Sequence, residues 1–237
     1  MFNLFRKTLL IFGLLAINIT SPGCGYITLG LYRSAFLIQS LLIISTLSIC
    51  WSGMIFTSLG IKILLIFVAS IYIANNIYLL IPLTKNTTEW KLRNIGVSGL
   101  FFIMSSSLFS YGFINKQKTL GFDINFVPSQ SMKPTLTAGD FILLDTSSLK
   151  TRQWSTNDIV IFNRENKIDY LYVKRINEKP LALAESDPAL FYMLGDNISA
   201  SYDSREFGLI HQDNFLGKAE IILFNISDPA RNLSIIR

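Results

Sequence analysis

The chain has 237 residues, of which 50% are apolar and 16% are charged, and its mean hydropathy is +0.42. This composition excludes a disordered chain, which needs low hydrophobicity and high charge, and it argues against a wholly soluble protein. Residues 1–113 carry seven Lys or Arg and one acid, whereas residues 114–237 carry fourteen basic and fifteen acidic groups. The net charge of +5 therefore belongs to the apolar half, which indicates membrane orientation and not nucleic-acid binding.

Four charge-free runs are each long enough for a transmembrane helix, which needs about 20 mostly apolar residues. They are Thr8–Tyr32, Ala35–Gly60, Ile63–Thr84 and Asn94–Asn115, with charged breaks at Arg33, at Lys62 and at Lys85–Arg93. A Ser-Pro-Gly-Cys-Gly segment interrupts the first run, which is consistent with a kinked span, an interfacial helix or a signal-like anchor. We therefore predict an α-helical anchor bundle of three or four spans over residues 1–115.

The positive-inside rule gives the orientation of this bundle. The loop Lys85–Arg93 has the most basic residues, and placing it in the cytoplasm sends the last span outward. Residues 116–237 are then expected on the outer face of the membrane. Four spans would put the N-terminus outside, which conflicts with Arg6 and Lys7, so either the first run does not span or these charges are tolerated.

The second half of the chain changes character at about residue 120, where short β-rich runs alternate with turn residues. We predict a small, mostly antiparallel β domain over residues 116–237, which is large enough for one core. The predicted strands are Phe141–Leu144, Ile159–Asn163, Ile168–Ile176, Phe191–Leu194 and Leu216–Phe224.

Few residues of this half bear the usual catalytic groups. It has no cysteine, and His211 is the only histidine of the chain, so we expect no redox chemistry, no metal and no cofactor. The two cysteines, Cys24 and Cys50, lie in apolar stretches of the first half and are interpreted as packing residues. If the domain hydrolyses amides, a Ser-Lys pair is the economical choice that remains.

Three segments are candidates for such a site. FVPSQSMKPTL at Phe126–Leu136 places two serines in a Pro-bracketed segment, but it is also typical of an ordinary polar turn. YLYVKRI at Tyr170–Ile176 puts Lys174 on one strand face with two tyrosines that can desolvate it, although a solvated lysine is the commoner case. MLGDNISASYDSREFG at Met193–Gly208 alone indicates no more than a polar surface loop.

Together the segments resemble the bacterial type I signal peptidases, which are membrane-anchored serine endopeptidases with a Ser-Lys dyad. PSQSMKPTL resembles the nucleophile box of that family, DIVIFNR the next strand, YVKRI the general-base box and GDNISASYDSREFG the final box. The four boxes occur in the family's order over about residues 126–224. The short interval before the final box is similar to the compact conjugative-transfer peptidases.

The resemblance implies a role for each matching residue. Ser131 matches the nucleophile and Lys174 the general base, while Ser129 matches the hydroxyl that joins the Ser131 backbone N–H in the oxyanion hole. Ser201 matches the serine that orients the lysine. The residues that match structural braces of the site are Asp196, Asp203, Arg205 and Arg175. The related endoplasmic-reticulum enzymes use histidine in place of the lysine, but His211 lies after the final box and is expected to be peripheral.

The resemblance also implies a substrate and a location. Expected partners are exported preproteins with small residues before the scissile bond, the lipid bilayer of the bacterial inner membrane and the protein-export machinery, but no nucleic acid. Three functions stay open at this point: a general signal peptidase, a dedicated peptidase for one pilin-like or secreted substrate, and a catalytically inert membrane scaffold.

Overall fold

The computed structural model describes residues 2–84, 92–147, 149, 152–164, 167–183 and 186–236. Two compact units make up the chain, the first formed by Met1–Ser52 and Ile61–Asn115 and the second by Gly53–Gly60 and Lys116–Arg237. Lys85 and Lys91 of the predicted cytoplasmic loop lie outside the described residues, as do the side chains of Arg6 and Lys7.

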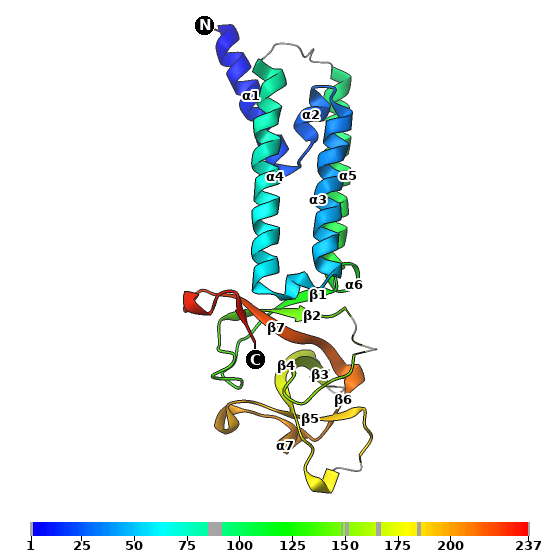
Figure 1. The fold of residues 1–237 in the computed structure, drawn as a ribbon, viewed down its shortest axis with the longest axis vertical. Helices are drawn as coiled ribbons and strands as arrows, with labels where there is room; N and C mark the ends of the chain where they lie inside the picture. The colour runs from blue at the N-terminus through cyan, green and yellow to red at the C-terminus, as the bar shows by residue number, and fades with distance from the viewer. Residues whose placement is uncertain are drawn as a thin grey trace. The chain divides into compact units, whose positions relative to one another are not determined.

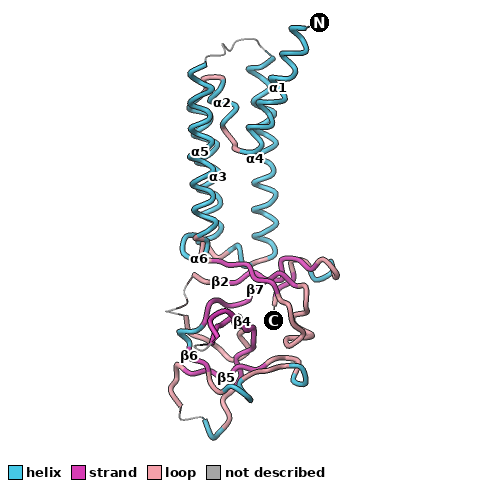
Figure 2. The backbone as a smooth tube through the Cα atoms, turned by 180° about the vertical axis from the view of Figure 1, so that it is seen from behind, coloured by secondary structure: helices cyan, strands magenta, loops and turns pink. Residues whose placement is uncertain are grey.

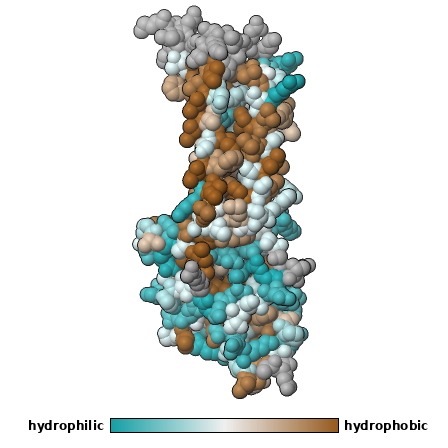
Figure 3. All heavy atoms as spheres, in the orientation of Figure 1, coloured by the Kyte–Doolittle hydropathy of each residue, from teal (hydrophilic) through white to brown (hydrophobic). Residues whose placement is uncertain are grey.

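The first unit consists of helices, three of which are long and apolar enough to cross a membrane within the described ranges. The helices are α1 (Phe2–Thr20), α2 (Cys24–Thr28), α3 (Tyr32–Trp51), α4 (Ser58–Thr84) and α5 (Leu92–Ile114) (Figure 1). Hydrophobic residues dominate the visible surface of α3 to α5 in Figure 3. The three long helices confirm the predicted anchor bundle, and within the described residues α1 contributes the shorter apolar stretch Ile11–Thr20.

The breaks between the helices differ from those predicted at Arg33 and Lys62. Arg33 lies in the first turn of α3 and Lys62 lies within α4, while the chain between these helices turns at Gly53, with φ 73°, and a short 3-10 helix, η1 (Met54–Phe56). The physical reason is that Arg and Lys are good helix formers whose long side chains reach polar surroundings from inside a helix. A glycine with positive φ ends a helix without steric cost.

Polar side chains connect the helices inside the apolar bundle. The side-chain oxygen of Asn18 on α1 accepts hydrogen bonds from the backbone N–H groups of Gly23 (3.0 Å) and Gly25 (3.3 Å). The hydroxyl of Tyr32 on α3 donates to the side-chain oxygen of Asn94 on α5 at 2.7 Å. Such bonds satisfy groups that would otherwise be unpaired in hydrocarbon, and they fix how α1, α2, α3 and α5 pack.

The second unit is built on an antiparallel sheet of eight strands, which confirms the predicted fold class. The strands are β1 (Phe122–Phe126), β2 (Asp140–Asp145), β3 (Ile159–Arg164), β4 (Lys167–Asn177), β5 (Leu190–Leu194), β6 (Ile210–His211), β7 (Phe215–Asn225) and β8 (Ser234–Ile235) (Figure 2). Their order is β1-β2-β7-β3-β4-β5-β6, and β8 pairs with β7. The five strands expected from the sequence correspond to β2, β3, β4, β5 and β7.

The alternation of side chains along β3 explains how this sheet buries both of its faces. Ile159 and Ile161 belong to one core cluster, with Met132 and Leu136 among its members, whereas Val160 and Phe162 belong to another. Successive side chains of a strand point to opposite faces, so an uninterrupted apolar run is what a strand buried on both sides requires. The first of these clusters lies under the turn that carries the candidate nucleophile.

Candidate active site

The candidate nucleophile stands in a turn that follows β1. Met132 and Leu136 in this turn are fully buried, and the backbone N–H of Leu136 donates to the carbonyl of Met132 at 2.8 Å. Val127 anchors the start of the segment, because its N–H donates to the carbonyl of Asp140 at 2.9 Å. Apolar anchors on both sides therefore hold Ser131 in place, and its side chain is only 6% exposed.

Ser131 and Lys174 are brought together although 43 positions separate them in the chain. The Nζ atom of Lys174 lies 2.7 Å from the Oγ atom of Ser131 and donates a hydrogen bond to it. Lys174 projects from β4 at the position paired with Val160 of β3, and it is 4% exposed. Contact between a serine hydroxyl and a lysine amine at this distance allows direct proton transfer.

The electrostatic surroundings favour the uncharged form of this amine. Burial lowers the pKa of Lys174 to about 8 from its ordinary value of 10.5, because the ammonium form loses its hydration. The negative charges of Asp203, Asp196 and Glu206 act in the opposite direction and raise the pKa, but they do not offset burial. A substantial fraction of Lys174 is therefore neutral, and able to accept a proton, in mildly alkaline solution.

Two further polar groups lie beside the Ser131 hydroxyl. The Oγ atom of Ser129 is 3.2 Å from the Oγ atom of Ser131, and Ser129 itself is exposed. Within the described part of the chain, the backbone N–H of Ser131 donates no hydrogen bond. An exposed hydroxyl and a free N–H next to a nucleophile are the kind of donors that stabilise a developing oxyanion.

Arg175, which follows the lysine, connects three segments around the site. Its guanidinium donates to both carboxylate oxygens of Asp196 at 2.8 Å, to the carbonyl of Asn157 at 2.9 Å and to the hydroxyl of Thr135 at 3.2 Å. Burial raises the pKa of Asp196, but hydrogen bonds from Arg175 and Thr135 outweigh it and leave the pKa lowered. Through these bonds Arg175 ties β4 to the turn that carries Ser131 and to the segment after β5.

Asp203 and Arg205 stabilise the loop that closes the site. Asp203 is fully buried and accepts hydrogen bonds from the guanidinium of Arg205 at 2.8 and 2.9 Å and from the N–H of Gly195 at 3.0 Å. It also caps the short helix α7 (Ser204–Phe207) in a capping box with Glu206. Burial would raise the pKa of the Asp203 carboxyl, but these hydrogen bonds outweigh it and lower the pKa to about 2.

Ser201 lies in the same loop, and among the described residues it makes no hydrogen bond to Lys174. It is 9% exposed, and its Oγ atom has no hydrogen-bond partner among the described residues. A Cβ atom at Gly195 would overlap this Oγ atom and would lie 2.6 Å from the carbonyl oxygen of Ser131, so only glycine fits there. The role of Ser201 in orienting Lys174 stays a prediction.

Asn197 contributes contacts that sequence reasoning missed. Its backbone N–H donates to the carbonyl of Ser131 at 3.0 Å, and its side-chain Nδ2 donates to the carbonyl of Gln130 at 3.1 Å. Both bonds join the turn that carries Ser131 to the segment after β5. The only sequence signal for them is that Asn197 follows the Gly-Asp pair of the final box.

A buried charge network behind the turn was also missed. Asp140 is fully buried and accepts from the guanidinium of Arg231 at 2.8 and 3.0 Å and from the side chain of Asn225 at 2.7 Å. Arg231 also donates to the carbonyl of Thr135 at 2.8 Å, and Asp140 accepts from the N–H of Thr137 at 2.8 Å. The network fixes the end of the turn that carries Ser131 through Arg231, which is 91 positions from Asp140, and the sequence offers no local signal for this contact.

The remaining candidate groups lie apart from this arrangement. His211 is on β6, where its Nδ1 accepts from the backbone N–H of Asp213 at 3.2 Å. Cys24 and Cys50 are buried free thiols in the helical unit. In the part of the chain that the structure describes, no group of three or more His, Cys, Asp or Glu is arranged to hold a metal ion.

Comparison with known proteins gives two findings that bear on this geometry. The family model "Signal peptidase, peptidase S26" matches residues 103–180 and 187–224. The chain is also 26% identical over 137 residues to a "Probable signal peptidase I-2" of Synechocystis sp., an alignment that covers 43% of this chain and 63% of that relative. The chain thus matches less than two thirds of the relative's length, and the family-model match includes the segments that meet at Ser131.

Proposed function

Because the chain belongs to the type I signal peptidase family, we propose that it is a membrane-bound serine endopeptidase that removes signal peptides from exported preproteins. Ser131 is the nucleophile and Lys174 the general base. The single observation that carries this proposal is the 2.7 Å contact between the two side chains at a lysine that is 4% exposed. Burying an ammonium group lowers the stability of the fold, so a buried lysine in contact with a serine hydroxyl is better explained by base catalysis than by a structural role.

The first chemical step is acylation. When Lys174 is neutral, the Ser131 hydroxyl donates its hydrogen bond to Nζ, and the proton moves to Nζ as Oγ attacks the scissile carbonyl carbon. The oxyanion that forms accepts hydrogen bonds from the Ser131 N–H and the Ser129 hydroxyl. The Lys174 ammonium then gives its proton to the leaving amine, which departs as the new N-terminus of the mature protein.

The second step is hydrolysis of the acyl-enzyme. Neutral Lys174 takes a proton from water as the water attacks the ester carbonyl, and the same donors hold the second oxyanion. Lys174 finally returns the proton to Ser131 Oγ, so the enzyme ends as it began. One buried amine therefore serves as base and acid in both halves of the reaction.

The other matched residues position this pair without touching the substrate. Asp196 holds Arg175, which in turn holds the nucleophile turn at Thr135. Asp203 and Arg205 shape the loop that presents Gly195. Ser201, which is adjacent to Gly195, is available to hydrogen-bond Lys174 when substrate binds.

The membrane orientation follows from the charges and from the three spans. If loop Lys85–Arg93 is cytoplasmic, α5 leads outward and residues 116–237 lie on the outer face, where preproteins emerge. Counting back through α5, α4 and α3 places the start of α3 on the cytoplasmic side, so Arg6 and Lys7 obey the same rule when α1 and α2 enter the bilayer without crossing it. A reporter fused after residue 116 that is active only in the cytoplasm would contradict this orientation.

Purified full-length protein in lipid vesicles, incubated with a bacterial preprotein, tests the activity. Ser131→Ala and Lys174→Ala should each abolish cleavage. The matched controls Ser155→Ala and Lys118→Ala, at exposed positions outside the site, should cleave like the parent. If Ser131→Ala and Lys174→Ala both cleave as fast as the parent, the dyad is wrong, and a parent without any cleavage would favour an inert scaffold.

The breadth of substrates requires a separate experiment. Expression in cells depleted of their own general signal peptidase should restore growth if the protein processes many preproteins. An active enzyme that fails to restore growth is instead dedicated to one pilin-like or secreted substrate. Copurification with the export machinery would identify that machinery as a partner.

A further inference from the structure

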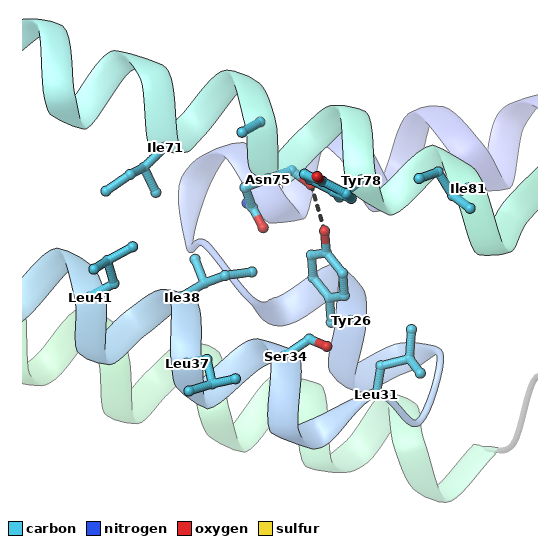
Figure 4. Close-up of a pocket in the computed structure, with 11 residues that line it drawn as sticks. Tyr26, Leu31, Ser34, Leu37, Ile38, Leu41, Ile71, Asn75, Tyr78 and Ile81 are labelled. Carbon is cyan, nitrogen blue, oxygen red and sulfur yellow. Dashed lines mark hydrogen bonds between the residues drawn. The ribbon is translucent and has the colours of Figure 1, made fainter.

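The helical unit contains a groove that the catalytic proposal does not use. It has a volume of about 550 Å³ and lies between α3 and α4, with Tyr26 of α2 at its floor (Figure 4). One wall runs from Leu31, which precedes α3, to Leu41 on α3, and the other runs from Ile71 to Ile81 on α4. The lining is mostly apolar, which suits an occupant that enters from the hydrocarbon of the bilayer.

One polar side chain in this groove is unpaired. Asn75 is 3% exposed, yet neither its Nδ2 nor its Oδ1 atom has a hydrogen-bond partner among the described residues. Figure 4 shows the side chain directed from α4 toward α3, while the Asn75 backbone carbonyl accepts a bond of 2.8 Å from the Tyr26 hydroxyl. The next residue, Asn76, has both side-chain atoms paired, with Tyr72 and Asn18. An unpaired carboxamide in hydrocarbon is costly, so the groove at Asn75 is suited to an occupant with polar backbone groups.

The length of the groove limits the kinds of helix that fit. Ten residue steps along each wall correspond to about 15 Å at the helical rise of about 1.5 Å per residue. The apolar core of a signal peptide has about 7–15 residues, or about 10–22 Å as a helix. A complete transmembrane helix has about 20 residues and spans about 30 Å, twice the length of the groove.

The unpaired carboxamide of Asn75 also distinguishes a signal-peptide helix from a complete transmembrane helix. The last four carbonyls of any helix lack a partner within the helix. A full transmembrane helix leaves those carbonyls near water, whereas a short signal-peptide helix ends inside the bilayer and needs donors there. The Nδ2 atom of Asn75 is such a donor, whereas an acyl chain of a lipid has no group that could pair with it.

We propose that the groove between α3 and α4 binds the apolar core of the substrate's signal peptide, with Asn75 pairing the carbonyls at the end of that short helix. This inference rests on the proposed function and adds to it a recognition site for the signal sequence. The groove selects precursors through binding, while Ser131 and Lys174 carry out the cleavage.

Filling the groove tests the proposal with a matched control on the same helix. Ala74→Trp places a large side chain in the groove, whereas Ala69→Trp adds the same side chain at an exposed position that does not line it. Each full-length variant is assayed in lipid vesicles with a complete preprotein and with a short peptide that carries only the residues around the scissile bond. Ala74→Trp should raise KM for the preprotein at least 10-fold and leave the short peptide unaffected, and Asn75→Leu should raise KM about 3- to 10-fold.

The outcomes separate this inference from the function on which it rests. Equal kinetics for Ala74→Trp and Ala69→Trp would overturn the inference alone, as would an equal loss on both substrates, which indicates a structural defect. A parent that cleaves neither substrate would overturn the proposed function together with the inference. A photo-crosslinker placed at Leu41 in the Ser131→Ala variant should label the apolar core of the preprotein. Labelling of lipid alone, or of a second copy of this chain, would refute the assignment.

Discussion

The pH dependence of cleavage is the most direct consequence of the buried lysine. With a pKa of about 8, Lys174 is neutral in about 9% of molecules at pH 7 and in about 91% at pH 9. At its ordinary pKa of 10.5 the neutral fraction of Lys174 at pH 7 would be about 0.03%. Burial therefore raises the neutral fraction at pH 7 about 300-fold. We therefore expect kcat/KM to rise about 10-fold between pH 7 and pH 9 and then to level off.

The assay measures initial rates of preprotein cleavage in lipid vesicles from pH 6 to pH 9.5. Lys174→Arg should be inactive across this range, because a guanidinium keeps its proton. A flat profile for the parent, or a rate that still rises steeply between pH 9 and pH 9.5, would refute the reasoning.

Stability must be followed alongside these rates, because the same group affects both. The folded pKa of Lys174 lies below its unfolded value, so folding is penalised where the buried amine is charged, below about pH 8. That penalty disappears as the pH rises from about 8 to about 10.5, so stability and activity change in the same direction. Thermal unfolding at each pH separates an unfolded enzyme from a protonated base, and Lys174→Met, which removes the buried charge, should unfold at a higher temperature than the parent at pH 7.

Three further outcomes are expected. Ser129→Ala should lower kcat about 100- to 1,000-fold with little change in KM or in unfolding temperature, because the exposed hydroxyl acts only on the oxyanion. Asp140→Asn should destabilise the full chain by about 2–4 kcal/mol in thermal unfolding, because Arg231 loses its buried charged partner. Glu206→Gln should shift the midpoint of the pH profile to lower pH, because the glutamate charge raises the pKa of Lys174; a shift to higher pH would contradict this account.

The strands that could be predicted from the sequence are those with a continuous apolar run. β2 and β3 have such runs, whereas β7 was recognised although buried and partly buried positions alternate along most of it. The strands that were missed are shorter or lie at an edge. β6 and β8 have two residues each and exist only because Leu190 pairs with His211 and Ile221 with Ile235, partners that no local pattern identifies.

Prediction of the site was uneven for similar reasons. The resemblance placed Ser131 and Lys174 in one site, and the structure brings their side chains together. Two tyrosines on the strand face of the lysine were expected to help desolvate it; Tyr172 is half-buried, but Tyr170, the farther of the two, is 65% exposed. The contact of Arg175 with Thr135 and that of Arg231 with Asp140 join segments 40 and 91 positions apart, so they depend on the folded topology and not on spacing.

The absence of room beside Gly195 has a consequence for engineering. The nucleophile turn and the loop at residues 193–208 share an interface in which the Ser131 carbonyl accepts from Asn197 and excludes any side chain at position 195. The two segments are distant in the sequence, but they pack together as one structural unit. Grafting either segment alone from a homologous enzyme would misfit the other, so a chimera that alters specificity through this loop must exchange both together.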